Sequence, residues 1–452
     1  MANPKKKETR ELRKIIHCFK VGIAMTLVSL YYYYNPWSDN TTQGAAMWAV
    51  MTVVVVFEFT VGGCIYKGLN RAMATLVAGG LALGVHWLAS ISGDKFEPII
   101  LGLSVFILAS IATFYRFDTK IKVWFDYGVV IFILTFSLIA VSGYQRDTLF
   151  ALAQQRLYNI GIGIFICLLV CFLICPVWAG EDLHLLIIWN MEKIADSLEV
   201  CTDEYFKGCG EDNDAIRQRL ESCDEDNYAI RQRLDAYKHI LNSKSSEDSL
   251  AILARWEPGH GSFGFRHPWN QYLKIGAAMR LCSYCLESLL GCIASQTQVT
   301  DESMKKHLSE ACMRLSFNSS RILKELAKCI KFMRKSNCMD LLLREQNNGV
   351  KELDNALRSL PPSNHPTKES MDLGFVSSFH GRELIVIISL LIEISARIIG
   401  VVEAVNLLAE QACFKPAKNE MEQEDEEVDM VSRKNSFVVT LGPEPVRTTE
   451  EA

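Results

Sequence analysis

The chain has no overall excess of basic residues, because 47 Lys and Arg stand against 52 Asp and Glu, a formal net charge of −5. This balance argues against a nucleic acid as the main partner. The sequence also lacks a nucleophile–base set, a phosphate-binding loop and a cluster of metal ligands, so an enzyme is the least favoured class and no cofactor is expected. A signal-peptide cleavage site is missing too. Lys5, Lys6 and Lys7 precede an apolar stretch that runs on to Tyr34, which predicts an uncleaved first helix.

Long apolar runs are confined to the first part of the chain, and each is long enough to cross a hydrocarbon core of about 30 Å as a helix. We expect six spans, at 15–34, 46–66, 72–92, 97–115, 124–143 and 157–179. The predicted fold is an all-α membrane protein with six transmembrane helices followed by a cytosolic helical domain. The predicted parts are an N-terminal arm (1–14), a pore domain (15–180), a cytosolic helical domain (181–415) and an acidic, disordered tail (416–452).

Two of these runs organise the membrane half. The spans at 46–66 and 72–92 are separated by a short segment that contains Lys67 and Arg71, which predicts an antiparallel hairpin with a basic turn. Glu58 lies near the middle of the first run. A carboxylate at that depth is costly if it faces lipid, so we expect Glu58 to face protein or a water-filled path. The pair of spans is therefore interpreted as the wall of a pore.

The distribution of charge and cysteine sets the expected orientation. None of the 15 cysteines lies in the connections at 35–45, 93–96 and 144–156, and thiols elsewhere stay reduced on a cytosolic side. Lys and Arg gather in the alternate connections, which the positive-inside rule assigns to the cytosol. We therefore expect both termini to be cytosolic. The basic residues of these cytosolic connections are Lys67, Arg71, Arg116, Lys120 and Lys122.

Basic residues also suggest what passes through the pore. Topology alone can explain the cytosolic ones, but Arg146 and Arg156 lie on the outer side, where the positive-inside rule disfavours them. Lys20 lies several residues inside the first span and either snorkels to the interface or faces the pore. Rings of fixed positive charge favour anions. We therefore predict an anion path, with Glu58 and Asp126 as counter-charges.

The region from 181 onward has the helical periodicity of a soluble domain. The segment WEPGHGSFGFRHPW at 256–269 interrupts it with glycine, proline and interleaved aromatics, which predicts an ordered loop that begins with Trp256, Glu257 and Pro258. His260 and His267 could bind a metal, but structural ordering through Glu257 and Arg266 is the favoured interpretation. The apolar stretch within 378–413 is long enough for a seventh span. Its amphipathic flanks and the spacing of Glu393 and Arg397 favour a buried helix of the soluble domain instead.

Five segments together closely resemble the plant aluminium-activated malate transporter family, from about 15 to 294 and more weakly to 414. They read WAVMTVVVVFEFTVG, KGLNRAMATLVAGG, FDYGVVIFILTFSLI, CPVWAGEDLH and WEPGHGSFGFRHPW. The resemblance implies an anion channel that passes malate and other small anions, with six spans per subunit and a homodimer in the lipid bilayer. It also implies that the basic residues named above line or gate the pore, and that Glu257 is linked to channel activity.

Activation by aluminium is a separate implication of the resemblance. A hard trivalent cation requires several oxygen ligands held together. Asp39 and Asp147 occupy the outer positions where responsive members carry acidic residues, whereas Ala151 stands where a further carboxylate is expected. A regulatory Al³⁺ site is therefore a hypothesis. The short N-terminal arm is similar to that of the plasma-membrane branch, with the vacuolar membrane as the alternative.

Two other classes compete with a channel. A secondary carrier for organic anions would fit the charges, although no internal repeat relates the first three spans to the last three. A membrane-anchored scaffold would leave Arg146, Arg156 and Glu58 without a purpose.

Overall fold

The computed structural model describes residues 4–34, 43–93, 96–142, 149–207, 231–264, 266–295, 302–359 and 373–416. Every regular element in these ranges is a helix, as the hydrophobic periodicity predicts. Asp39, Arg146, Asp147 and the acidic tail from residue 417 lie outside the described residues, so their predicted roles stay predictions.

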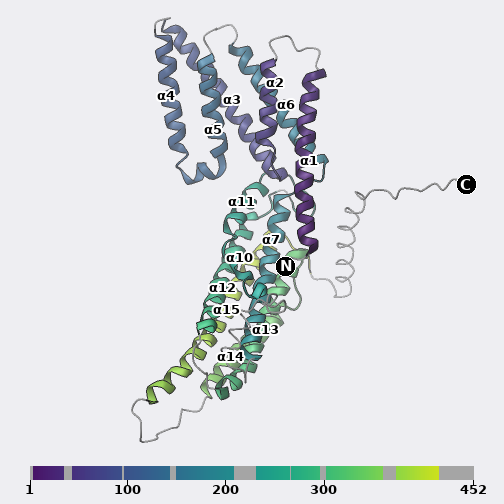
Figure 1. The fold of residues 1–452 in the computed structure, drawn as a ribbon, viewed down its shortest axis with the longest axis vertical. Coiled ribbons are helices and arrows are strands. Elements are labelled where there is room, and N and C mark those ends of the chain that lie inside the picture. The colour runs from purple at the N-terminus through teal and green to yellow at the C-terminus, as the bar shows by residue number, and fades with distance from the viewer. Residues whose placement is uncertain are drawn as a thin grey trace, which may run out of the picture.

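Six helices form the membrane bundle at the top of Figure 1. Their bounds are α1 (Pro4–Tyr34), α2 (Gln43–Val56), α3 (Val61–Ile91), α4 (Glu97–Tyr115), α5 (Thr119–Ser142) and α6 (Leu149–Leu173). Two separate apolar clusters hold the bundle together. One joins α1, α2 and α6 with the start of α3, and the other joins α3, α4 and α5 with Ala153 of α6. Helices α3 and α6 therefore contribute to both clusters.

The remaining helices form an elongated bundle below, which we call the helical domain (Figure 1). Their bounds are α7 (Ala179–Lys207), α10 (Ala236–Leu241), α11 (Lys244–Ala254), α12 (Trp269–Ser295), α13 (Glu302–Phe332), α14 (Met339–Arg358) and α15 (Leu373–Gln411). One continuous apolar core runs through this domain, with contributions from all of these helices.

The predicted hairpin turn at 67–71 is wrong. Helix α2 ends at Val56, residues 57–60 form the break, and α3 continues without interruption through Lys67 and Arg71. The Thr60 side chain caps the new helix by accepting a hydrogen bond from the Gly63 N–H at 3.2 Å. Glu58 consequently lies in the break between two helices and not in the middle of a span. The first apolar run continues across this break, so the hydrophobic pattern alone does not reveal that the helix ends there.

By length and composition, six of the described helices are long and apolar enough to cross a membrane. Five of them belong to the membrane bundle. Helix α2 is shorter, with 14 residues, or about 21 Å. The sixth candidate is Leu384–Gln411 in α15. This segment contributes Leu384, Ile388 and Ile398 to the core of the helical domain, with each side chain fully buried. The interpretation of α15 as a buried helix of the helical domain is therefore confirmed by its packing.

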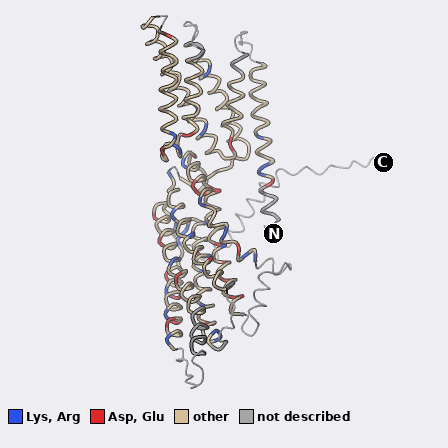
Figure 2. The backbone as a smooth tube through the Cα atoms, turned by 60° about the vertical axis from the view of Figure 1, so that its left-hand side comes forward, with Lys and Arg blue, Asp and Glu red and all other residues tan. Residues whose placement is uncertain are grey.

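Charged residues are distributed unevenly along the molecule. Figure 2 shows the membrane helices almost free of charge over their upper length, with basic and acidic residues gathered where the bundle meets the helical domain. The boundary between the two parts is therefore the most polar region near the membrane, and most of the predicted site residues lie there.

Candidate functional site

The carboxylate of Glu257 lies where the two parts of the protein meet, and it binds the N-terminus of α7. Its Oε1 accepts a hydrogen bond from the Ala179 N–H at 2.6 Å, and its Oε2 accepts one from the Gly180 N–H at 3.0 Å. The Gly62 N–H, in the first turn of α3, donates to the same side chain. Because the first N–H groups of a helix have no partner within the helix, one carboxylate satisfies two helix ends at once.

The environment of Glu257 is tight and mostly closed to water. The side chain is 7% exposed, and burial raises the pKa of its carboxyl above the ordinary value, an effect that the hydrogen bonds from Gly180 and Ala179 oppose. A Cβ on Gly180 would lie 2.5 Å from the Trp269 ring, so only glycine fits between that ring and Glu257. The glutamate is therefore held in place by close packing as well as by hydrogen bonds.

The residues around Glu257 in the same loop contact three further elements. The Trp256 ring lies 5.8 Å from that of Tyr66 in α3 and 6.4 Å from that of Trp124 in α5, centroid to centroid. The His260 ring stacks on Trp178 at 3.8 Å, just before α7. Pro258 is exposed, and its carbonyl accepts a hydrogen bond from His260 Nδ1 at 2.9 Å. The predicted ordered loop is thus a connector between the helical domain and the membrane bundle.

Two histidines behind this loop share one tyrosine hydroxyl. His184 Nδ1 lies 3.0 Å from the Tyr272 hydroxyl, and His267 Nε2 lies 3.3 Å from it. Burial lowers the pKa of both imidazoles to about 4 and raises the pKa of the Tyr272 phenol. Among the described residues no group of three or more His, Cys, Asp or Glu side chains could hold a metal ion. His267 therefore contacts Tyr272 inside the fold, which supports the structural interpretation of this histidine.

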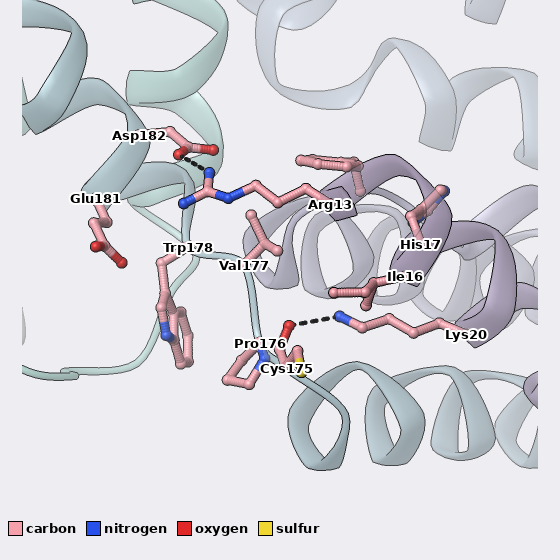
Figure 3. Close-up of a pocket in the computed structure, with 11 residues that line it drawn as sticks. Arg13, Ile16, His17, Lys20, Cys175, Pro176, Val177, Trp178, Glu181 and Asp182 are labelled. Atoms are coloured by element: carbon pink, nitrogen blue, oxygen red, sulfur yellow. Dashed lines mark hydrogen bonds and ion pairs between the residues drawn. The ribbon is translucent and has the colours of Figure 1, made fainter. Parts of the chain in front are cut away.

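Lys20 is one of the predicted pore residues, and it lies beside a cavity of about 270 Å³ between α1 and the segment that joins α6 to α7. Its side chain is 2% exposed, and its Nζ donates to the Cys175 carbonyl at 2.8 Å. Figure 3 shows this bond together with the ion pair of Arg13 and Asp182, at 2.9 Å, across the same cavity. In this arrangement Lys20 ties α1 to the end of α6.

The cations of α3 form a polar cluster with α5. Lys67 pairs with Glu58, so Glu58 is a counter-charge, although it lies at the helix break and not at mid-span. The Lys67 ammonium also lies over the Tyr127 ring, 5.9 Å from its centroid. Arg71 Nη1 donates to the Tyr127 hydroxyl at 3.3 Å. No sequence pattern indicates Tyr127 as a partner of these cations, because it lies more than 50 positions further along the chain.

A second cluster lies at the same end of the bundle. Arg116 binds Asp126 through two hydrogen bonds, of 2.8 and 3.3 Å, and both side chains are about two-fifths exposed. Asp126 is thus the counter-charge of Arg116, as predicted. Lys122 is exposed on α5, and Lys120 lies in the first turn of that helix. These basic residues lie at the connection between α4 and α5 or in the first turn of α5.

Arg156 lies near the start of α6, at the opposite end of the bundle from Arg71. Its side chain is 8% exposed, and its guanidinium lies over the Trp48 ring of α2, 4.2 Å from the centroid. Among the described residues, no carboxylate lies within ion-pair distance of Arg156 or of Arg71. The buried guanidinium groups of Arg71 and Arg156 thus lack an acidic partner in that part of the chain, as does the buried ammonium of Lys20.

Comparison with known proteins supplies the family. The family model described as aluminium activated malate transporter matches residues 7–372. The chain belongs to this family. It is 46% identical to aluminum-activated malate transporter 10 of Arabidopsis thaliana over 89% of this chain and 83% of that protein. It is 39% identical to aluminum-activated malate transporter 1 of Triticum aestivum, again over 89% of this chain and 83% of that protein.

Family membership makes the protein a multi-pass membrane protein of a transporter family and not an enzyme. The match spans both the membrane bundle and most of the helical domain. The residues around Glu257 lie within this match and connect the helical domain to α3.

The substitution Glu257→Gln should loosen the junction, because an amide can accept only one of the two hydrogen bonds from Ala179 and Gly180. We expect hydrogen exchange of these two amides to speed up by about tenfold or more, the effect of losing one hydrogen bond to a charged group. Exchange followed by mass spectrometry on the purified chain measures this. Glu310→Gln, at an 80% exposed side chain, is the matched control. Equal protection in both variants would contradict the junction role.

The buried histidines should make the helical domain sensitive to acid. A histidine whose pKa falls from 6.5 to about 4 on folding stabilises the fold above pH 6.5, and this contribution is lost as the pH falls toward 4. For His184 the free energy of unfolding falls by about 3 kcal/mol over this pH range. Thermal unfolding between pH 7.5 and 4.5 should show a steep decline that His184→Gln flattens. The exposed-site variant His307→Gln should keep the decline, and the same slope in both variants would refute the assignment.

Proposed function

We propose that the protein is an anion channel that passes malate and other small anions across a plant membrane. The observation that carries this proposal is the presence of two buried guanidinium groups, Arg71 and Arg156, toward opposite ends of the membrane bundle. The relatives of this protein are named malate transporters, which supports malate as one of the anions.

A charge that is buried without an opposite charge destabilises a protein. Removing a guanidinium from water costs several kcal/mol, and proteins usually offset this cost with a carboxylate and further hydrogen bonds. Arg71 has a phenol hydroxyl and Arg156 an aromatic face, and neither partner carries a full negative charge. A passing anion supplies the missing charge at both places. Fixed cations along a pathway also repel other cations, which supports anion selectivity.

The orientation follows from the basic residues at the lower end of the bundle. Lys67 lies near the start of α3, Arg116 directly after α4 and Lys122 in the first turn of α5. These helix ends face the helical domain in Figure 1, and the positive-inside rule assigns such an end to the cytosol. We therefore propose that the helical domain and both termini are cytosolic. This orientation holds for the plasma membrane, which we favour, and equally for the vacuolar membrane.

We further propose a homodimer. Helix α4 carries large exposed apolar side chains, and only its Ala112 is buried, so much of the bundle surface is available to lipid or to a second copy. Regulation by external Al³⁺ through Asp39 and Asp147 remains part of the proposal. Carboxylates are the ligands that hard cations prefer.

Two-electrode voltage clamp on cells loaded with malate tests the function. Wild-type chains should give inward current from anion efflux, with a reversal potential that follows the malate gradient. Arg71→Gln and Arg156→Gln should each reduce this current by about tenfold or more, since removing a close charge costs on the order of 1–4 kcal/mol of anion stabilisation. Arg321→Gln, at an exposed residue of α13, should leave it unchanged.

The outcomes separate the classes. Unchanged currents in both membrane variants at equal surface expression would remove these arginines from the path. Transport without unitary current steps would favour a carrier, and no transport from chains at the surface would favour a scaffold. External aluminium at mildly acid pH should raise the current in the wild type but not in a variant with Asp39→Asn and Asp147→Asn together.

A further inference from the structure

Two cysteines from different helices meet inside the membrane bundle. Cys64 lies in the first turn of α3, and Cys171 lies in the last turn of α6. Both residues are at most 1% exposed, and their Sγ atoms are 3.4 Å apart. The two residues are 107 positions apart in the sequence, so this contact joins distant parts of the chain.

Cys64 also contacts the break between α2 and α3. Its Sγ accepts a hydrogen bond from the Glu58 N–H at 3.1 Å and donates one to the Glu58 carbonyl at 3.4 Å. Gly62, two residues before Cys64, has the N–H that donates to Glu257. The Cys64 thiol therefore lies within one helical turn of the junction with the helical domain, and a covalent bond to it would fix the start of α3.

A cation and a cavity lie beside this pair of thiols. The Lys20 ammonium interacts electrostatically with both of them and with the thiol of Cys175. An ammonium close to a thiol stabilises the thiolate, which is the form that reacts. Lys20 and Cys175 line the cavity of about 270 Å³ that Figure 3 shows. Because a water molecule takes about 30 Å³ in the liquid, a small polar oxidant fits into this cavity.

We propose that Cys64 and Cys171 form a modification site at which hydrogen peroxide generates a disulfide between α3 and α6. The Cys171 thiolate attacks one oxygen of the peroxide, the O–O bond breaks, and the leaving hydroxide takes up the proton that the thiol had released. Cys64 then attacks the sulfur of the resulting sulfenic acid. The S–S bond forms, the S–O bond breaks, and the proton of Cys64 leaves with the hydroxide as the second water. Two thiols are thus oxidised by two electrons, and one peroxide is reduced to two waters.

The two sulfur atoms need little movement to form this bond. A disulfide holds them about 2.05 Å apart, so the present gap of 3.4 Å closes by about 1.3 Å. Oxidation also removes the hydrogen bond from Cys64 to the Glu58 carbonyl, because a disulfide has no S–H group. A cross-link that prevents α3 from shifting against α6 should lower the current of the proposed channel. This consequence rests on the proposed function, whereas the cross-link does not.

Peptide mapping by mass spectrometry without reduction tests the disulfide directly. After alkylation of free thiols, trypsin releases residues 21–67, in which Cys64 is the one cysteine, and residues 157–193, which contain Cys167, Cys171 and Cys175. Hydrogen peroxide added to membranes that contain the full chain should join these two peptides, with a mass lower than their sum by two hydrogen atoms. Dithiothreitol should separate them again.

Variants identify the partner of Cys64. Cys171→Ala should abolish the linked pair of peptides, whereas Cys167→Ala and Cys175→Ala should retain it. Cys167 is the matched control, because it is buried in the same apolar cluster and its thiol instead lies 3.9 Å from the Val53 carbonyl. Peptides that stay unlinked in the wild type after peroxide treatment would overturn the site. A link that persists in Cys171→Ala would overturn the assignment of this residue.

Voltage clamp measures the consequence for transport. Hydrogen peroxide should remove most of the malate current of the wild type, dithiothreitol should restore it, and Cys64→Ala should keep its current in peroxide. Surface labelling shows which variants reach the membrane, and Cys64→Ser replaces Cys64→Ala if the latter does not. Linked peptides without any current from chains at the surface would leave the thiol site intact and overturn the proposed function. Linked peptides with a current that peroxide does not change would overturn the effect of the cross-link on opening.

Discussion

The arrangement of the two parts depends on one buried carboxylate that is shared by two helix ends. Glu257 binds the first N–H groups of α7 at 2.6 and 3.0 Å and also accepts from Gly62 in α3. The neighbouring Val61 N–H donates to the Val177 carbonyl at 2.9 Å, just before α7. Helix α3 therefore begins on a set of contacts that the helical domain and its connection supply. A buried charge held in this way loses much of its stabilisation if either helix end moves away.

This constraint has a consequence for the proposed transport, because α3 also carries two of the cations, Lys67 and Arg71. Lys67 and Arg71 lie within three turns of its start, and both contact Tyr127 of α5. A shift of the helical domain that displaces the N-terminus of α3 would move this polar face relative to α5. Closely packed helices respond to a small displacement by changing from one packing arrangement to another and not by deforming gradually. The junction is thus suited to control access to the proposed anion path.

Much of this architecture could be predicted from the sequence, and the failures have a physical cause. The apolar runs predicted the membrane bundle, and the aromatic-rich loop at 256–269 predicted an ordered element around Glu257. The break at 57–60 was missed because hydrophobicity continues across it, and only the side-chain cap of Thr60 marks the new helix. Partners such as Tyr127 and Trp178 were also missed. Their contacts join residues far apart in the chain, and periodicity carries no information about such pairs.

Combined with the proposed channel function, the position of Glu257 predicts that this residue controls opening without lining the path. Single-channel recording of Glu257→Gln beside the wild type tests it most directly. We expect the variant to have a lower open probability with the same unitary conductance and the same permeability ratio for malate and chloride, because the residues proposed to meet the anion are unaltered. An unchanged open probability together with an altered unitary conductance would place Glu257 on the ion path and contradict the account.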